Sequence, residues 1–179
     1  MGFKRKMAVL GMVICLLLGL IGCGGARADR LAWGHVQGKW VGEWSAKAQV
    51  HYANQECAVS LKRSPVERFE VIFEGPENLK GLRVTFLPDR TEMCYQGQNL
   101  SFSSGRLSEH SVAGQLANVV ELIPILDPEQ LRLERQDGQL LAQAEGLDLT
   151  ADLESGNILT LSIPDEELEL ELLNFQNLA

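Results

Sequence analysis

The sequence is short of positive charge and of histidine. It contains 16 Lys and Arg residues against 24 Asp and Glu residues, a net charge of −8, and only three histidines. An acidic surface repels phosphate backbones and anionic headgroups, so the composition argues against a nucleic-acid-binding protein. The histidines, His35, His51 and His110, are not spaced to share an ion, and we expect no metal site.

Motifs of catalysis are also lacking. The sequence has no nucleophile elbow, no Walker-type phosphate loop and no zinc-binding helix motif. Glu109 and Glu121 have no second carboxylate beside them with which to hydrolyse a glycoside. The acidic stretch "DLESG" lacks the regularly spaced oxygen ligands of a calcium loop and is typical of a hairpin turn. We therefore expect a protein that is not an enzyme and that needs no cofactor.

The chain has only one long apolar run, and it lies near the N-terminus. Lys4, Arg5 and Lys6 precede the run from Met7 to Gly22, which is the layout of a secretory signal peptide. A lasting transmembrane helix more often needs about 20 apolar residues. The run ends in "LIGC", which resembles a bacterial lipobox with its cysteine at Cys23. This resemblance implies cleavage before Cys23 and acyl chains on its sulfur, such as diacylglycerol and palmitate.

Three segments follow from this interpretation. Residues 1–22 are a lipoprotein signal peptide, residues 23–40 hold the lipidated cysteine and a short tether beginning "GGARAD", and residues 41–179 form one domain. The mature chain keeps 13 basic and 24 acidic residues. We expect it on the extracytoplasmic face of the cell membrane, lipid-anchored through Cys23. The alternatives are an ordinary secretory signal and an uncleaved anchor.

Most of the domain alternates between apolar and polar residues with a period of two, which is typical of half-buried strands. In "WSAKAQVHY" the residues Trp44, Ala46, Ala48, Val50 and Tyr52 share one face. Similar strands follow, and Asp137-Gly138 and Ser155-Gly156-Asn157 are predicted hairpin turns. In the last strand, "EELELELLNF", the glutamates form a solvent-exposed face, and we predict that this strand is an edge of the sheet protected by charge. About nine or ten antiparallel strands result.

The period becomes helical once, between Ser108 and about Ile123, and Pro124 ends this segment. The sequence therefore predicts a mainly β, α+β fold in which one amphipathic helix crosses a curved antiparallel sheet. One helix cannot easily cover so many strands, so part of the concave face is a candidate ligand pocket. The candidate lining residues come from the strands and from the helix: Trp44, Phe69, Phe73, Phe86, Met93, Tyr95, Leu116 and Val119. The alternative is a fully packed core.

Two cysteines remain in the predicted domain. Cys15 lies in the apolar run, and Cys23 is the predicted lipidation site. An oxidised Cys57–Cys94 pair is chemically permitted in an exported chain. The alternation of the strands argues against this pairing, so two separate half-buried thiols are the alternative.

Several motifs occur in an order that resembles a known family. They are "FEVIFEGPENLKGL" from Phe69 to Leu82, "YQG" from Tyr95 to Gly97, and "DLESG" before the last strands. In this order the chain resembles the LolA-like lipoproteins of Gram-positive, often spore-forming bacteria, over roughly residues 44–175. The resemblance implies the fold of the carriers LolA, LolB and LppX, a strongly curved antiparallel half-barrel with a helix across its hollow.

The resemblance also implies two functions of different kinds. The first is a membrane-anchored lipoprotein that binds a lipid or another apolar ligand in its concave sheet. The alternative is a non-enzymatic interaction or regulatory module for a cell-envelope or spore-germination partner, as in GerS-like proteins. The family offers no catalytic residues to transfer. We expect a monomer that contacts the membrane through Cys23, has a possible lipid or envelope-protein partner, and binds no nucleic acid.

Overall fold

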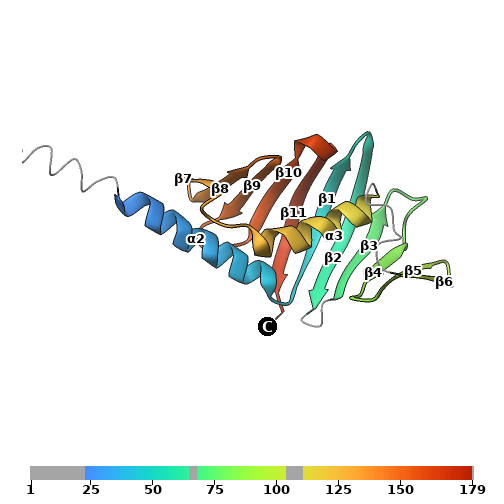
Figure 1. Cartoon of the computed structure of the whole chain (residues 1–179). Coiled ribbons are helices and arrows are strands. Elements are labelled where there is room, and N and C mark those ends of the chain that lie inside the picture. Colours follow the sequence, from blue (N-terminus) through green and yellow to red (C-terminus); the bar gives the residue numbers. More distant parts are fainter. Residues whose placement is uncertain (1–22, 65–67, 104–110, 179) are drawn as a thin grey trace, which may run out of the picture.

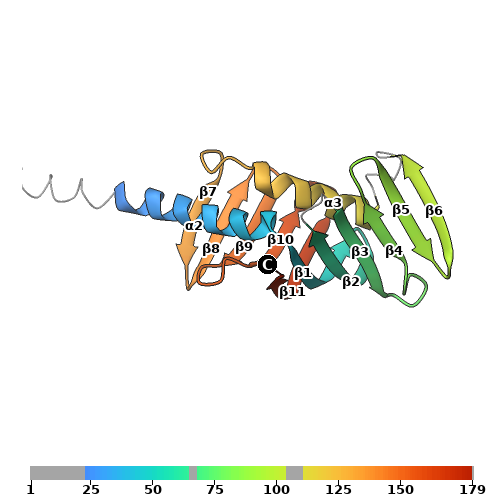
Figure 2. The same ribbon diagram turned by 90° about the horizontal axis from the view of Figure 1, so that it is seen from below.

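The structure is a computed structural model, and it describes residues 23–64, 68–103 and 111–178. These residues form one antiparallel sheet of eleven strands in the order β6-β5-β4-β3-β2-β1-β11-β10-β9-β8-β7. The sheet curves around two helices that lie on the same side of it (Figures 1 and 2). The predicted mainly β, α+β half-barrel is confirmed, although two helices rather than one lie on the concave face.

The first half of the sheet follows the alternating pattern of the sequence. Each strand from β1 to β6 pairs with the next along the chain. Their bounds are Trp44–Tyr52, Gln55–Ser64, Arg68–Gly75, Arg83–Phe86, Arg90–Tyr95 and Gln98–Ser103. In β1 the predicted apolar face is buried from Trp44 to Val50. Because successive side chains point to opposite faces, this pattern fixes which side of the sheet is concave.

The second half contains strands β7 to β11. Their bounds are Arg132–Gln136, Gln139–Ala144, Leu147–Asp152, Ile158–Ile163 and Leu168–Asn177. Asp137 and Gly138 join β7 to β8 with φ values of 51° and 80°. Positive φ at both central residues is the conformation of a tight two-residue hairpin, so the predicted turn is confirmed.

Strand β11 lies at the centre of the sheet and not at its edge. It pairs with β1 on one side and with β10 on the other. Glu169 and Glu171 are exposed on its convex side, as predicted, while Leu168, Leu170 and Leu172 are buried. The prediction of a charged edge strand was therefore wrong. Alternation shows which face of a strand is exposed to solvent, but it does not show which strands lie beside it.

Residues that the sequence predicted as a tether form a helix instead. Helix α2 spans Cys23–Val41, and it buries Trp33, Val36 and Trp40 in the core. These three residues are spaced to lie along one side of a helix. The division at residue 40 between tether and domain is corrected accordingly: the folded unit includes α2.

Two arginines on the concave side of the sheet hold α2 near its two ends. Arg135 of β7 donates to Asp29 at 2.5 Å, and Arg63 of β2 donates to the carbonyl of Trp40 at 3.0 Å. The Trp44 indole donates to the same carbonyl at 2.8 Å. The last carbonyls of a helix have no partner within the helix, so these two donors complete the C-terminal end of α2.

Helix α3 spans Val112–Leu122 and continues into the short helix η1, Ile123–Ile125. Ser111 caps the N-terminal end of α3, because the Ser111 hydroxyl accepts from the Gly114 amide. Gln37 of α2 donates to the carbonyls of Ile123 and Leu126. A second short helix, η2, spans Pro164–Glu166 between β10 and β11. The two main helices are therefore joined to each other as well as to the sheet.

Cys57 and Cys94 are both free thiols, so the predicted possible disulfide is not formed. Cys57 pairs with Val50 on the concave side, whereas Cys94 pairs with Arg83 on the convex side. Strands β3 and β4 also separate the two cysteines. Opposite faces and three strand spacings place the pair beyond the reach of a disulfide, about 4.4–6.8 Å between Cα atoms.

Candidate binding site on the concave face

An apolar row crosses the concave face from the centre of the sheet to its β6 edge. Val71, Val84, Met93 and Leu100 are direct cross-strand partners on β3, β4, β5 and β6. Their side chains become steadily more exposed toward the edge: Val71 is 0 %, Val84 1 % and Leu100 57 % exposed, with Met93 intermediate. The apolar face therefore continues beyond the packed core.

A second row runs parallel to the first and carries aromatic rings. Phe69, Phe86, Thr91 and Phe102 are cross-strand partners on the same four strands. The rings of Phe69 and Phe86 stack with centroids 6.0 Å apart, and Phe69 lies 6.3 Å from the ring of Trp44. Phe86 and Phe102 are half-buried. The row thus links the aromatic core to the β6 edge.

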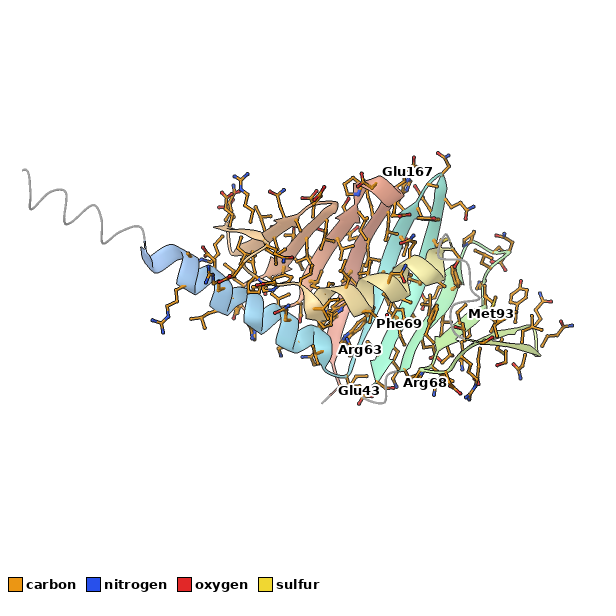
Figure 3. All side chains as sticks on the ribbon, in the orientation of Figure 1. Glu43, Arg63, Arg68, Phe69, Met93 and Glu167 are labelled. Atoms are coloured by element: carbon orange, nitrogen blue, oxygen red, sulfur yellow. The ribbon has the colours of Figure 1, made fainter. Side chains whose placement is uncertain are left out.

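Neither helix extends over β5 and β6. Helix α3 lies across the middle of the sheet and α2 lies toward β7, so that the concave side of the last two strands stands clear of both (Figures 1 and 2). Figure 3 shows Met93 in this part of the sheet, beyond the end of α3. We call the surface formed by Phe86, Met93, Leu100 and Phe102 the open end.

The structure divides the predicted lining residues into two groups. Five are buried in the packed core under the helices: Trp44, Phe69, Phe73, Leu116 and Val119. The other three, Phe86, Met93 and Tyr95, are half-buried and lie toward β5. Leu100 and Phe102 belong to the open end and were not among the predicted lining residues. The alternation in "QNLSFS" is the signal that would have found them.

Polar groups form the rim of the open end. Tyr95 lies on the same face as Met93, and its hydroxyl donates to the carbonyl of Asn78 at 2.9 Å. Asn78 belongs to the β3–β4 connection, in which Leu79 and Leu82 pack against the core. A half-buried apolar surface with a few fixed polar groups beside it is the usual composition of a site for an apolar ligand.

Arg63 is a charged side chain beside the aromatic row, since it is the cross-strand partner of both Trp44 and Phe69. Partial burial lowers the pKa of its guanidinium, and the charge of Glu121 on α3 acts in the opposite direction. One guanidinium nitrogen already donates to the Trp40 carbonyl. We therefore assign Arg63 to the packing of α2 and not to the open end.

Among the residues that the structure describes, no three His, Cys, Asp or Glu side chains gather where they could hold a metal ion. The His35 imidazole lies over Gly156 in the β9–β10 turn. His51 faces Glu56 at 3.6 Å on the convex side. His110 and Glu109 lie outside the described residues.

Cys23, the predicted lipidation site, is the first residue of α2. The predicted signal peptide, residues 1–22, lies outside the described residues. Within the described part of the chain, no helix combines the length and the apolar character needed to cross a membrane.

No protein-family model and no curated protein matches the sequence. The structure is similar to an uncharacterized conserved protein from Thermus thermophilus, with a TM-score of 0.53 and 14 % identity over 84 % of this chain and 87 % of that one. It also matches LprF from Mycobacterium bovis, with a TM-score of 0.45 and 9 % identity over 84 % of this chain and 94 % of that one.

A LolA superfamily protein from Nitrosomonas europaea matches with a TM-score of 0.41 and 9 % identity over 80 % of this chain and 92 % of that one. What the sequence resemblance implied about architecture is confirmed: the fold is LolA-like, a curved open antiparallel sheet with helices across its concave face.

Proposed function

We propose that this chain is an extracytoplasmic lipoprotein, anchored through acyl chains on Cys23, that binds a lipid or another apolar ligand at the open end. Its role is binding and not catalysis. One observation carries the proposal: the apolar row from Val71 to Leu100 continues beyond the part of the sheet that the helices cover. Contiguous apolar surface of this kind on a soluble domain marks a binding site.

Native mass spectrometry of residues 24–179, prepared without detergent, tests ligand binding. The buried core cluster lies within the described residues 23–178, so this fragment keeps the whole of it. We expect an additional stoichiometric mass after incubation with membrane lipid extract, and its loss on organic extraction. A clean apo mass after the same incubation would contradict lipid binding.

A pair of matched variants places the ligand. Leu100→Glu puts a charge on the open end, and Leu173→Glu puts the same charge on the convex face of β11, where Leu173 pairs with Lys47. Both leucines are exposed, at 57 % and 38 %, so neither change buries a charge. We expect Leu100→Glu to lose the additional mass and Leu173→Glu to keep it. Equal binding by both variants would show that the ligand binds elsewhere than at the open end.

Anchoring has a separate test. In cells, Cys23→Ala should stop acylation, and the protein should then be released from membranes or accumulate with its signal uncleaved. A Cys23→Ala protein that is still cleaved and still membrane-bound would rule out the lipobox.

The β6 edge favours a second candidate, a protein-interaction module. Strand β6 ends the sheet, pairs with β5 without a register shift, and has the sequence "QNLSFS", which contains no charged residue and no proline. Charges, prolines and bulges are the usual protection of an edge strand. The opposite edge, β7, does carry charges, at Arg132, Glu134 and Arg135. An unprotected edge can accept a strand from an envelope protein.

Ser101→Lys distinguishes the two candidates. Lysine on the edge opposes strand addition, while the apolar face of β6, which carries Leu100 and Phe102, is unchanged. If the chain works by strand addition, this variant should lose crosslinks to its partner on intact cells and keep any lipid mass. If the lipid is lost and the crosslinks persist, the edge is not the partner site.

A further inference from the structure

One side of α2 faces away from the domain along its whole length. Arg27, Leu31, Gly34, Gly38 and Val41 are spaced by four and three residues, which places them on one side of a helix. All five are exposed, and Trp33, Val36 and Trp40 are buried on the other side. We call these five residues the α2 outer face.

The α2 outer face is apolar as well as exposed. Leu31 is 69 % exposed and Val41 51 %. The two positions between them are glycines, and an added Cβ at either would meet no atom within 4 Å. No polar side chain therefore separates Leu31 from Val41. Ile125, which is 77 % exposed, belongs to η1, beside which α2 packs.

The charge of α2 is opposite to that of the rest of the domain. Helix α2 contains three basic residues, Arg27, Arg30 and Lys39, and one acid, Asp29, which is paired with Arg135. Residues 42–179 contain ten basic and 23 acidic residues. Arg30 forms an ion pair with Glu129 at 3.3 Å. Arg27 is exposed on the α2 outer face.

The start of α2 coincides with the predicted anchor. The helix begins at Cys23, and its first turns extend past β7 at the end of the sheet (Figures 1 and 2). Helix α2 runs from Cys23 through the two residues that fix it to the sheet, Asp29 and Trp40. Acylation would therefore hold α2 itself at the lipid headgroups.

We propose that the α2 outer face lies against an anionic lipid bilayer, with Leu31 and Val41 at the headgroup boundary and Arg27 beside the phosphates. This inference rests on the proposed acylation of Cys23. Exposed apolar residues beside basic ones are typical of interfacial helices, and basic residues near the surface are attracted to anionic lipids. The acidic remainder of the domain is screened beyond a Debye length of about 8–10 Å.

A labelling experiment on the full-length, lipidated protein tests this arrangement. Single thiol probes, Leu31→Cys and the control Leu173→Cys, are placed in a Cys94→Ser background, and Cys57 stays because it is buried. Each protein is reconstituted into vesicles of phosphatidylcholine alone, or with about one third phosphatidylglycerol, and labelled with a membrane-impermeant maleimide.

We expect Leu31→Cys to react several-fold more slowly in the anionic vesicles than in the neutral ones, and Leu173→Cys to react at the same rate in both. Adding Arg27→Glu should remove the protection of Leu31→Cys. Equal rates for Leu31→Cys in the two vesicles would overturn the proposal. Disulfide-linked dimers of Leu31→Cys in both vesicles would overturn it too, because they would show that the face docks on a second helix.

Flotation with the vesicles and the mass of the N-terminal peptide separate this inference from the proposed function. A chain that carries no diacylglycerol and does not float contradicts the anchoring, and the inference fails with it. A chain that is acylated and floats but leaves Leu31→Cys unprotected contradicts the inference alone.

Discussion

Gly156→Ala tests the packing of α2 on the sheet with a single methyl group. Gly156 lies in the β9–β10 turn with φ +71°, and an added Cβ would be 2.5 Å from Cδ2 and 2.7 Å from Nε2 of His35. The substitution therefore has two costs. Alanine in the left-handed region costs about 1–2 kcal/mol, and turning the exposed His35 ring out of its rotamer costs about 0.5–1.5 kcal/mol more.

Gly138→Ala is the matched control. Gly138 has φ +80° in the β7–β8 turn, and an added Cβ would meet no atom within 4 Å. It carries the conformational cost alone. We expect urea unfolding to show Gly156→Ala about 1 kcal/mol less stable than Gly138→Ala. In a His35→Ala background, this difference should disappear.

The reasoning is refuted if the two alanine variants lose the same free energy and His35→Ala changes neither. That result would mean that the His35 ring does not lie over Gly156, and that the middle of α2 does not pack against the β9–β10 turn. Residues 23–40 would then regain their interpretation as a tether.

Three other predictions concern single groups. Gly38→Ala should raise the free energy of unfolding in urea by about 0.5–1 kcal/mol, because alanine favours a helix and the added Cβ has open space. A thiol reagent should modify Cys94 in the native protein and both cysteines after denaturation, with no reductant needed, because burial shields Cys57 and raises its pKa. Hydrogen bonds from Ser155 lower the pKa of Asp152 below its usual 3.8, so their stabilisation is present above that pH and is lost as the pH falls through the lowered pKa. The thermal midpoints of the wild type and Asp152→Ala should therefore differ at neutral pH and converge in acid.

The strands were predictable because the sheet has one buried face and one solvent-exposed face. That arrangement imposes a period of two, and β1 occupies the nine residues whose alternation was clearest. Local turn chemistry at Asp137-Gly138 added the hairpin. The helix α3 was found because its period differs from that of the strands on both sides of it.

Helix α2 was missed for a physical reason. Gly34 and Gly38 lower its intrinsic helix propensity, and it begins at the cysteine of the predicted lipobox, after which the sequence was interpreted as a short tether. Its stability comes from tertiary contacts: the Trp40 indole donates to the Val120 carbonyl, and Arg63 completes the helix end. The spacing of Trp33, Val36 and Trp40 was the available signal.

The central position of β11 and the open end share another cause. Each depends on contacts between segments far apart in the sequence: β1 pairs with β11, and α3 ends its cover of the sheet before β5. Alternation gives the face of Leu100 but not what lies above it. The predicted lining residues of the strands lie on the concave face, and two of them, Trp44 and Phe73, are buried in the packed core.

The open end lies at the β6 edge of the sheet, whereas the N-terminal part of α2 lies toward the β7 edge (Figure 1). Helix α2 packs beside β7 and β8, whereas Leu100 belongs to β6, with nine strands between β6 and β7. Substitutions more than about 7–10 Å apart with no shared partner add independently. Loss of membrane contact by Arg27→Glu should therefore leave ligand occupancy unchanged, and Leu100→Glu should leave the protection of residue 31 unchanged. Strong coupling between the two would mean that one lipid surface covers both ends of the domain, which contradicts the assignment of anchoring to α2 and of ligand binding to β4, β5 and β6.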